Sequence, residues 1–284
     1  MSSPYSDPFF ALGVPAIVAA LGIAAVWWLR RHRPLGSPSL GWEGVAVAAG
    51  LGLGVYLVRG WNGLPPGNVN DWPLLLALPA AVLALLAPLG LKTFLPLALG
   101  FVALATPLVL SVPLRTWSAG QAALWLPTFA LPWLLLLLLA RATAERQPGC
   151  ALPAWGATLG CAAVAAHLGH SDALAMALGG SAVAAGTGAV ARLVLGDVLR
   201  PAPIAVALAA LAPCWWLLAH SLADVPATAL VPLAAAPLAA WLAWPLRQRP
   251  WTAGVVAAVA AAMVGGGAIW LVSVANPPAP APGW

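Results

Sequence analysis

The chain contains the stretch GQAALWLPTFALPWLLLLLLA at residues 120–140, which has no charged residue. A bilayer core about 30 Å thick requires about 20 apolar residues in a helix, so this stretch predicts a transmembrane span. Dividing the rest of the sequence at charges, His residues and Pro/Gly clusters gives nine further stretches of the same kind. The ten predicted spans are residues 9–29, 42–58, 73–90, 94–111, 120–140, 152–168, 173–195, 202–219, 225–244 and 251–273. Eight or nine spans remain the alternatives, because 94–111 contains two prolines and 173–195 is mostly Ala and Gly.

The composition supports the same class of protein. Of the 284 residues, 62% are hydrophobic and only 7% are charged, against roughly 25% charged residues in a soluble domain. The dispersed Lys and Arg residues form no basic face, which excludes a nucleic-acid partner. We therefore predict an all-α, polytopic integral membrane bundle of about ten helices with short loops. It occupies residues 1–274, has no soluble domain and no nucleotide site, and is followed by a Pro-rich extended tail at 275–284.

The basic residues predict how the chain is oriented in the membrane. Ten of the twelve Lys and Arg residues fall on one set of loops: Arg30, Arg31, Arg33, Lys92, Arg141, Arg146, Arg192, Arg200, Arg247 and Arg249. The other set contains only Arg59 and Arg115. Cytoplasmic loops carry the excess of positive charge, so both termini are expected on the trans side of a bacterial cell membrane. The first apolar stretch is followed, not preceded, by positive charge, which indicates a retained helix and not a signal peptide.

Histidine and aspartate residues gather at the trans ends of two predicted spans. The sixth span ends with His167, His170 and Asp172, and the eighth ends with His220 and Asp224. Imidazole and carboxylate groups are ligands for zinc, copper or iron, and two histidines from different helices could ligate a haem. A second interpretation is that each histidine caps its own helix, because a protonated imidazole is favourable at a helix C-terminus. A metal or haem is the only cofactor that the sequence suggests.

The chain contains sixteen Trp residues, far more than its Tyr or Phe residues, and most lie near span ends, where aromatic belts occur. Trp133, Trp215 and Trp216 lie deeper and are the candidates for lining a cavity.

Glycine clusters predict close helix packing, since in lipid small residues let helix backbones approach one another. The packing candidates, which also offer faces to protein partners, are Gly50, Gly54, Gly180, Gly186 and Gly266.

No predicted span carries a carboxylate near its middle, and Glu43 lies at the mouth of its span. Ion-coupled carriers and membrane enzymes usually place acidic groups there, so no catalytic residue is predicted.

The sequence favours a non-enzymatic, membrane-embedded subunit or scaffold of a larger assembly. An alternative is a permease for a small neutral or apolar solute, because the fifth and ninth spans contain proline pairs that resemble the broken helices of transporters. A metal- or haem-binding membrane protein is the second alternative.

Overall fold

The structure is a computed structural model that describes residues 12–32, 40–59 and 72–277. Within these ranges the chain is helical and contains no strand. The α-helices are α1 (Val14–Arg31), α2 (Trp42–Arg59), α3 (Trp72–Leu86), α4 (Leu91–Val109), α5 (Ser111–Leu114), α6 (Ala119–Arg146), α7 (Ala151–Leu168), α8 (Asp172–Leu195), α9 (Pro201–Leu222), α10 (Ala227–Ala235) and α11 (Pro250–Ala275). Two 3₁₀ segments, η4 (Gly196–Val198) and η5 (Ala236–Leu246), follow α8 and α10.

The all-α prediction is confirmed, and the chain has the properties of a multi-pass membrane protein. Eight helical stretches are long and apolar enough to cross a bilayer, and two shorter apolar helices, α2 and α3, accompany them. Each of the ten ranges expected from the sequence overlaps one of these helices. The predicted tail begins at the last residue of α11, and its residues 278–284 lie outside the described ranges.

The ninth expected span is not one continuous α-helix. It begins as α10 and changes at Ala236 into η5, an 11-residue 3₁₀ segment. Proline has no backbone N–H and its ring clashes with the preceding turn. Pro232 and Pro237 interrupt the α-helical bonding pattern on either side of this change, which accounts for its position.

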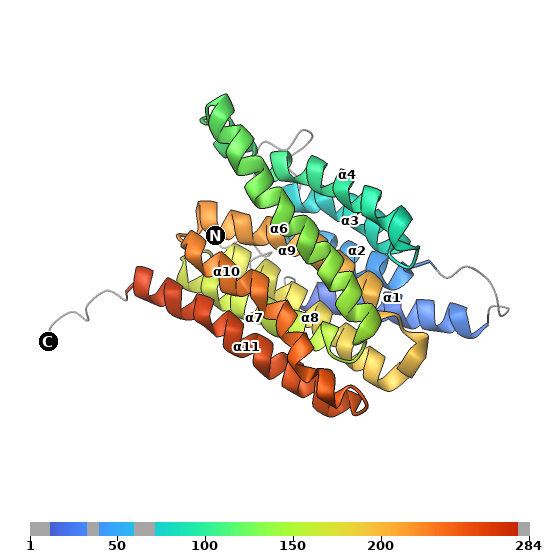
Figure 1. Cartoon of the computed structure of the whole chain (residues 1–284). Coiled ribbons are helices and arrows are strands. Elements are labelled where there is room, and N and C mark those ends of the chain that lie inside the picture. Colours follow the sequence, from blue (N-terminus) through green and yellow to red (C-terminus); the bar gives the residue numbers. More distant parts are fainter. Residues whose placement is uncertain (1–11, 33–39, 60–71, 278–284) are drawn as a thin grey trace, which may run out of the picture.

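Helix α9 lies at the centre of the bundle, and residues 201–219 are all buried. It contacts α2, α3, α6, α7 and α8, while α4 and α11 lie on opposite outer sides (Figure 1). A helix that is apolar on every side is buried either in lipid or among other helices, and α9 is enclosed by its neighbours. The many alanines of α9 allow these neighbours to approach its backbone closely.

The charged and histidine side chains of the described residues lie near the two ends of the bundle. We call one the basic end, defined by Arg30, Glu43, Arg141, Arg146, Arg192, Arg200 and Arg247. We call the other the histidine end, defined by His167, His170, Asp172, His220 and Asp224. The candidate residues for any chemistry are therefore found at these ends.

Candidate functional site

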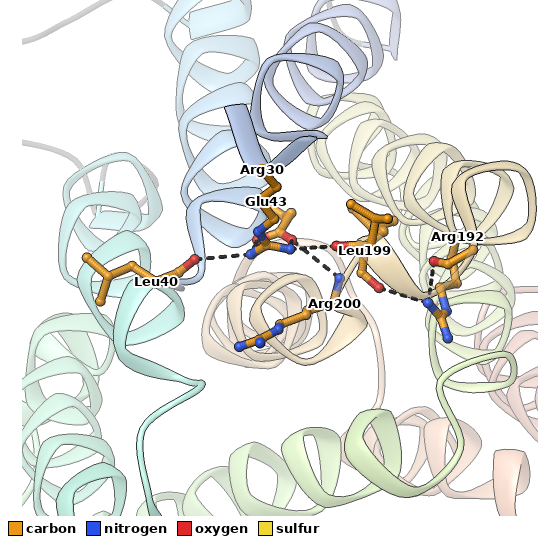
Figure 2. A network of polar contacts seen from close by, with 8 residues as sticks. Arg30, Leu40, Glu43, Arg192, Leu199 and Arg200 are labelled. Carbon is orange, nitrogen blue, oxygen red and sulfur yellow. Dashed lines mark hydrogen bonds and ion pairs between the residues drawn. The ribbon is translucent and has the colours of Figure 1, made fainter. Parts of the chain in front are cut away.

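A buried ion pair joins three helices at the basic end (Figure 2). Glu43, in the first turn of α2, is 0% exposed and pairs with Arg30 at the end of α1, with 3.0 Å between Nη2 and Oε2. The backbone N–H of Arg200, which precedes α9, donates to the other Glu43 oxygen at 3.3 Å. A buried carboxylate is costly unless it is both paired and hydrogen-bonded, and Glu43 is both.

Arg30 extends this network to two backbone carbonyls. Its Nη1 donates to Val198 O at 2.7 Å, and its Nη2 donates to Leu40 O at 3.2 Å. Val198 belongs to η4, so Arg30 holds the turn between α8 and α9 against the start of α2. We call Arg30, Glu43 and the backbone groups that they bind the α1–α2–α9 clamp.

Arg192, in the last turn of α8, stabilises the same turn from its other side. Its Nη1 donates to Leu199 O at 3.1 Å and to Gly196 O (Figure 2). Gly196 has a φ of +64°, a left-handed conformation that favours glycine, and it ends α8. The guanidinium groups of Arg30 and Arg192 therefore both bind carbonyls of residues 196–199.

The end of α6 places two further polar side chains in buried positions. Arg141 donates from Nε to Glu145 at 2.8 Å and from Nη2 to Leu89 O at 2.6 Å, and its guanidinium lies 4.7 Å from the centre of the Phe94 ring. Gln147 is 1% exposed, and neither its amide nitrogen nor its amide oxygen has a hydrogen-bond partner in the described part of the chain. Leaving a buried polar group unpaired costs about 1–3 kcal/mol.

A cavity of about 380 Å³ opens beside Gln147. Arg146, Arg192 and Arg247 line it together with Gln147 and Cys150. We call it the arginine cavity. Guanidinium groups recognise phosphate and carboxylate groups through paired N–H donors, so this arrangement is suited to an anion.

Tryptophan rings hold two of these arginines at the wall of the cavity. The Arg146 guanidinium lies 5.9 Å from the Trp241 ring and the Arg247 guanidinium 4.5 Å from the Trp244 ring. The two rings stack with 5.8 Å between centroids, and Trp241 Nε1 donates to Thr143 at 2.9 Å. These are cation–π contacts, which orient a guanidinium without consuming its N–H donors.

The turn between α6 and α7 contributes a thiol to the arginine cavity. Burial raises the pKa of the Cys150 thiol above its ordinary value, because a low-polarity environment disfavours the thiolate. The raised pKa makes the Cys150 thiolate less populated than that of an exposed cysteine, and the thiol correspondingly less reactive.

The histidine end brings some of the predicted ligands together. His167 Nδ1 lies 2.7 Å from Asp172 Oδ1, and His220 Nδ1 lies 2.8 Å from Val225 O. The loops after α7 and α9 are in contact, since a Cβ at Gly169 would overlap the carbonyl oxygen of Ala223. Among the described residues, no group of three or more His, Cys, Asp or Glu side chains is arranged to hold a metal ion. The metal or haem site stays a prediction from the sequence.

The remaining two residues of this cluster have unusual backbone conformations. His170 has a φ of +64° and Asp224 a φ of +41°, both in the left-handed region. The Asp224 carbonyl accepts a hydrogen bond from Asn276 Nδ2 at 3.1 Å. His167 and His220 lie in the last turns of α7 and α9, the positions that the capping interpretation requires.

Two of the three deep tryptophans line a common cavity. Trp133 and Trp216 border an apolar space of about 100 Å³ between α6, α9 and α10. Trp133 Nε1 donates to Ala209 O at 3.2 Å, and Trp216 stacks on Trp155. Trp215 is buried in α9, and the Nε1 atoms of Trp215 and Trp216 have no partner in the described part of the chain.

The predicted packing glycines occupy different environments. A Cβ at Gly50 would lie 3.1 Å from Pro15 O, so Gly50 permits the close contact of α1 with α2. Gly54 and Gly180 are buried. A Cβ at Gly186 or Gly266 would meet nothing within 4 Å, so these two positions have free space beside them.

Two further close backbone approaches involve glycines that the sequence analysis did not single out. A Cβ at Gly41 would overlap the Ala84 carbonyl oxygen, and one at Gly44 would overlap the Pro203 carbonyl oxygen. These contacts set the start of α2 directly against α3 and α9, beside the α1–α2–α9 clamp. No local sequence signal identifies them, because their contact partners are distant in the chain.

Comparison with protein-family models, with curated proteins and with solved structures finds no match to this chain. The fold defines a multi-pass α-helical membrane protein, and any more specific role must be argued from its own geometry.

Proposed function

We propose that the protein is a non-enzymatic, membrane-embedded subunit or scaffold of a larger assembly. The observation that carries this proposal is the complete burial of residues 201–219 in α9. Secondary transporters typically bind their substrate near the midplane, between discontinuous helices. Here the central helix is continuous, apolar and enclosed, while the charged side chains that the structure describes lie at the two ends of the bundle.

One outer face of α11 supports an assembly role. Met263, Gly266 and Trp270 follow one another at helical spacing, and Met263 and Trp270 are exposed. Gly266 leaves a gap between two large side chains, because a Cβ there would meet nothing within 4 Å. We propose that a helix of a partner chain packs into this gap, as small residues allow in lipid.

Mass measurement after extraction from native membranes in a mild detergent tests this proposal. We expect a complex larger than the 28.8 kDa chain, containing a stoichiometric second polypeptide. Gly266→Leu should release that polypeptide while the bundle stays folded. Gly100→Leu is the matched control, because Gly100 also has free space but lies on α4, across the bundle. Recovery of the wild-type chain only as a monomer would contradict the proposal.

A permease for a small neutral or apolar solute is the second candidate. It is favoured by the apolar cavity of about 100 Å³, which Pro132 and Pro213 border. Pockets that enclose small-molecule ligands usually measure about 300–1,000 Å³, so this space is small for a solute site. A permease also requires a path for its solute through the bundle, and labelling of Cys214 in α9 would detect an accessible path beside that helix.

We further propose that the basic end faces the cytoplasm, with both termini on the opposite side. The support is the gathering of arginines from α1, α6, α8 and η5 at one end of the bundle, as the positive-inside rule requires. A cysteine introduced by Gln248→Cys should be protected from an impermeant reagent in intact cells, and one introduced by Gly120→Cys should react. The reverse pattern would overturn the orientation.

A further inference from the structure

The arginine cavity gathers positive charge from three segments that are far apart in the sequence. Arg146 ends α6, Arg192 lies in the last turn of α8, and Arg247 follows η5. No acidic side chain is among the described residues that line the cavity. Glu145 lines the neighbouring cavity of about 300 Å³, where it is paired with Arg141.

Two of the three guanidinium groups retain their hydrogen-bonding capacity. Arg146 and Arg247 contact tryptophan rings and form no ion pair with an acidic side chain of the described ranges. The third, Arg192, is fixed by the carbonyl groups of Gly196 and Leu199. Arg146 and Arg247 therefore present oriented cationic donors that no acidic side chain of the described residues pairs with.

Gln147 provides an independent indication of a ligand. Its side chain is enclosed at the wall of the same cavity, and both of its amide atoms lack partners in the described part of the chain. Buried polar groups in native proteins are nearly always hydrogen-bonded, so each exception requires an explanation. An anionic oxygen bound in the cavity would accept a hydrogen bond from Gln147 Nε2.

From these contacts we infer that the arginine cavity binds the phosphate group of a phosphate ester. We assign a phosphate and not a carboxylate because a phosphate ester offers more charge and more acceptor oxygens to a wall of three arginines and Gln147. We assign an ester because about 380 Å³ exceeds what a lone phosphate fills. The ligand is either the headgroup of an anionic phospholipid or a soluble phosphate ester. This inference does not depend on the proposed scaffold function, since either could hold without the other.

Titration of the purified, delipidated full chain tests the inference, with intrinsic tryptophan fluorescence and thermal unfolding as readouts. The probes are dihexanoyl-phosphatidylglycerol and glycerol 3-phosphate. Saturable binding of the lipid alone identifies a headgroup site, and binding of glycerol 3-phosphate as well identifies a site open to soluble esters. If neither probe binds saturably, the inference is overturned.

Three variants distinguish binding in the arginine cavity from nonspecific electrostatic binding to a basic surface. Arg146→Gln and Arg247→Gln should each weaken binding about tenfold, since each removes a charge-assisted donor pair. Arg249→Gln is the matched control, because Arg249 is exposed at the same end and does not line the cavity. It should change the affinity less than twofold. Equal losses in Arg247→Gln and Arg249→Gln would overturn the inference.

Gln147→Leu adds a readout that a purely structural role would not produce. Without ligand, this variant should unfold at a higher temperature than the wild type, because it removes unpaired buried polar atoms. It should also bind the active probe about tenfold more weakly. A variant with unchanged affinity would contradict the role of Gln147 in binding.

Discussion

The basic end and the histidine end of the bundle hold their polar groups in different ways. At the basic end, Arg30 binds Val198 and Glu43 binds Arg200, contacts that span 168 and 157 positions of the chain. At the histidine end, His167 binds Asp172 and His220 binds Val225, and each contact spans only five positions. The first set joins helices that are far apart in the sequence, whereas the second connects a helix end to residues just beyond the turn that follows it.

Burial separates the two ends just as strongly. Glu43 is fully enclosed, whereas the side chains of His167 and Asp172 are 68% and 76% exposed. Exposed ion pairs contribute little to stability, but breaking a buried pair leaves an uncompensated charge. The prominent His/Asp motif and the energetically important polar contacts therefore lie at opposite ends of the molecule.

The largest expected effect is at the α1–α2–α9 clamp. Glu43→Gln should lower the free energy of unfolding by about 3 kcal/mol, the lower end of the range for breaking a buried pair, because Arg30 retains its two carbonyl partners. Denaturant unfolding in detergent measures this change. Glu145→Gln is the control, since Glu145 is about half exposed. Equal destabilisation by both variants would contradict the claim that the buried Glu43 pair contributes more to stability than the half-exposed Glu145 pair.

A backbone contact should dominate stability at the histidine end. Gly169→Ala should cost about 2 kcal/mol, because its Cβ would overlap the Ala223 carbonyl oxygen and the loops would have to separate. Gly160→Ala on the same helix meets nothing within 4 Å and should be neutral or slightly stabilising. The same unfolding assay compares them, and a tolerated Gly169→Ala would show that the loops do not depend on this contact.

The exposed pair at the histidine end should matter least to stability. Asp172→Asn and His167→Ala should each change the free energy of unfolding by no more than about 0.5 kcal/mol. The metal content and the absorption spectrum of the purified wild type and of both variants should be measured alongside. Stoichiometric metal or a Soret band, lost in either variant, would instead support the site predicted from the sequence.

The smallest effect concerns the reactivity of Cys150. Because burial raises the pKa of this thiol, its thiolate fraction at pH 7 should be below that of an exposed cysteine. Its alkylation rate should keep rising with pH beyond about 8.5, the ordinary thiol pKa, where an exposed cysteine introduced by Gln248→Cys begins to level off. Parallel rate profiles for the two thiols would contradict this environment.

The difference between the ends also explains what the sequence could and could not predict. Apolar length predicts the helices, because bilayer thickness acts on each segment separately. The sequence also indicates the His/Asp cluster, in which the His167–Asp172 and His220–Val225 contacts are local. It places Glu43 at a helix mouth, but burial there depends on Arg30 and Arg200, which only the assembled bundle brings near. The same holds for the arginine cavity, whose walls come from three separate parts of the chain.

The most direct test of the central claim, that the bundle is packed around α9, uses the native thiol of Cys214. This residue is fully buried in α9. In a Cys150→Ala, Cys161→Ala background, we expect no reaction of Cys214 with a charged methanethiosulfonate in permeabilised membranes, under conditions that fully label a cysteine introduced by Gln248→Cys. Reaction should occur only after denaturation in SDS. Labelling of Cys214 in the folded protein would show that water reaches α9, which would contradict the packed scaffold and favour the permease.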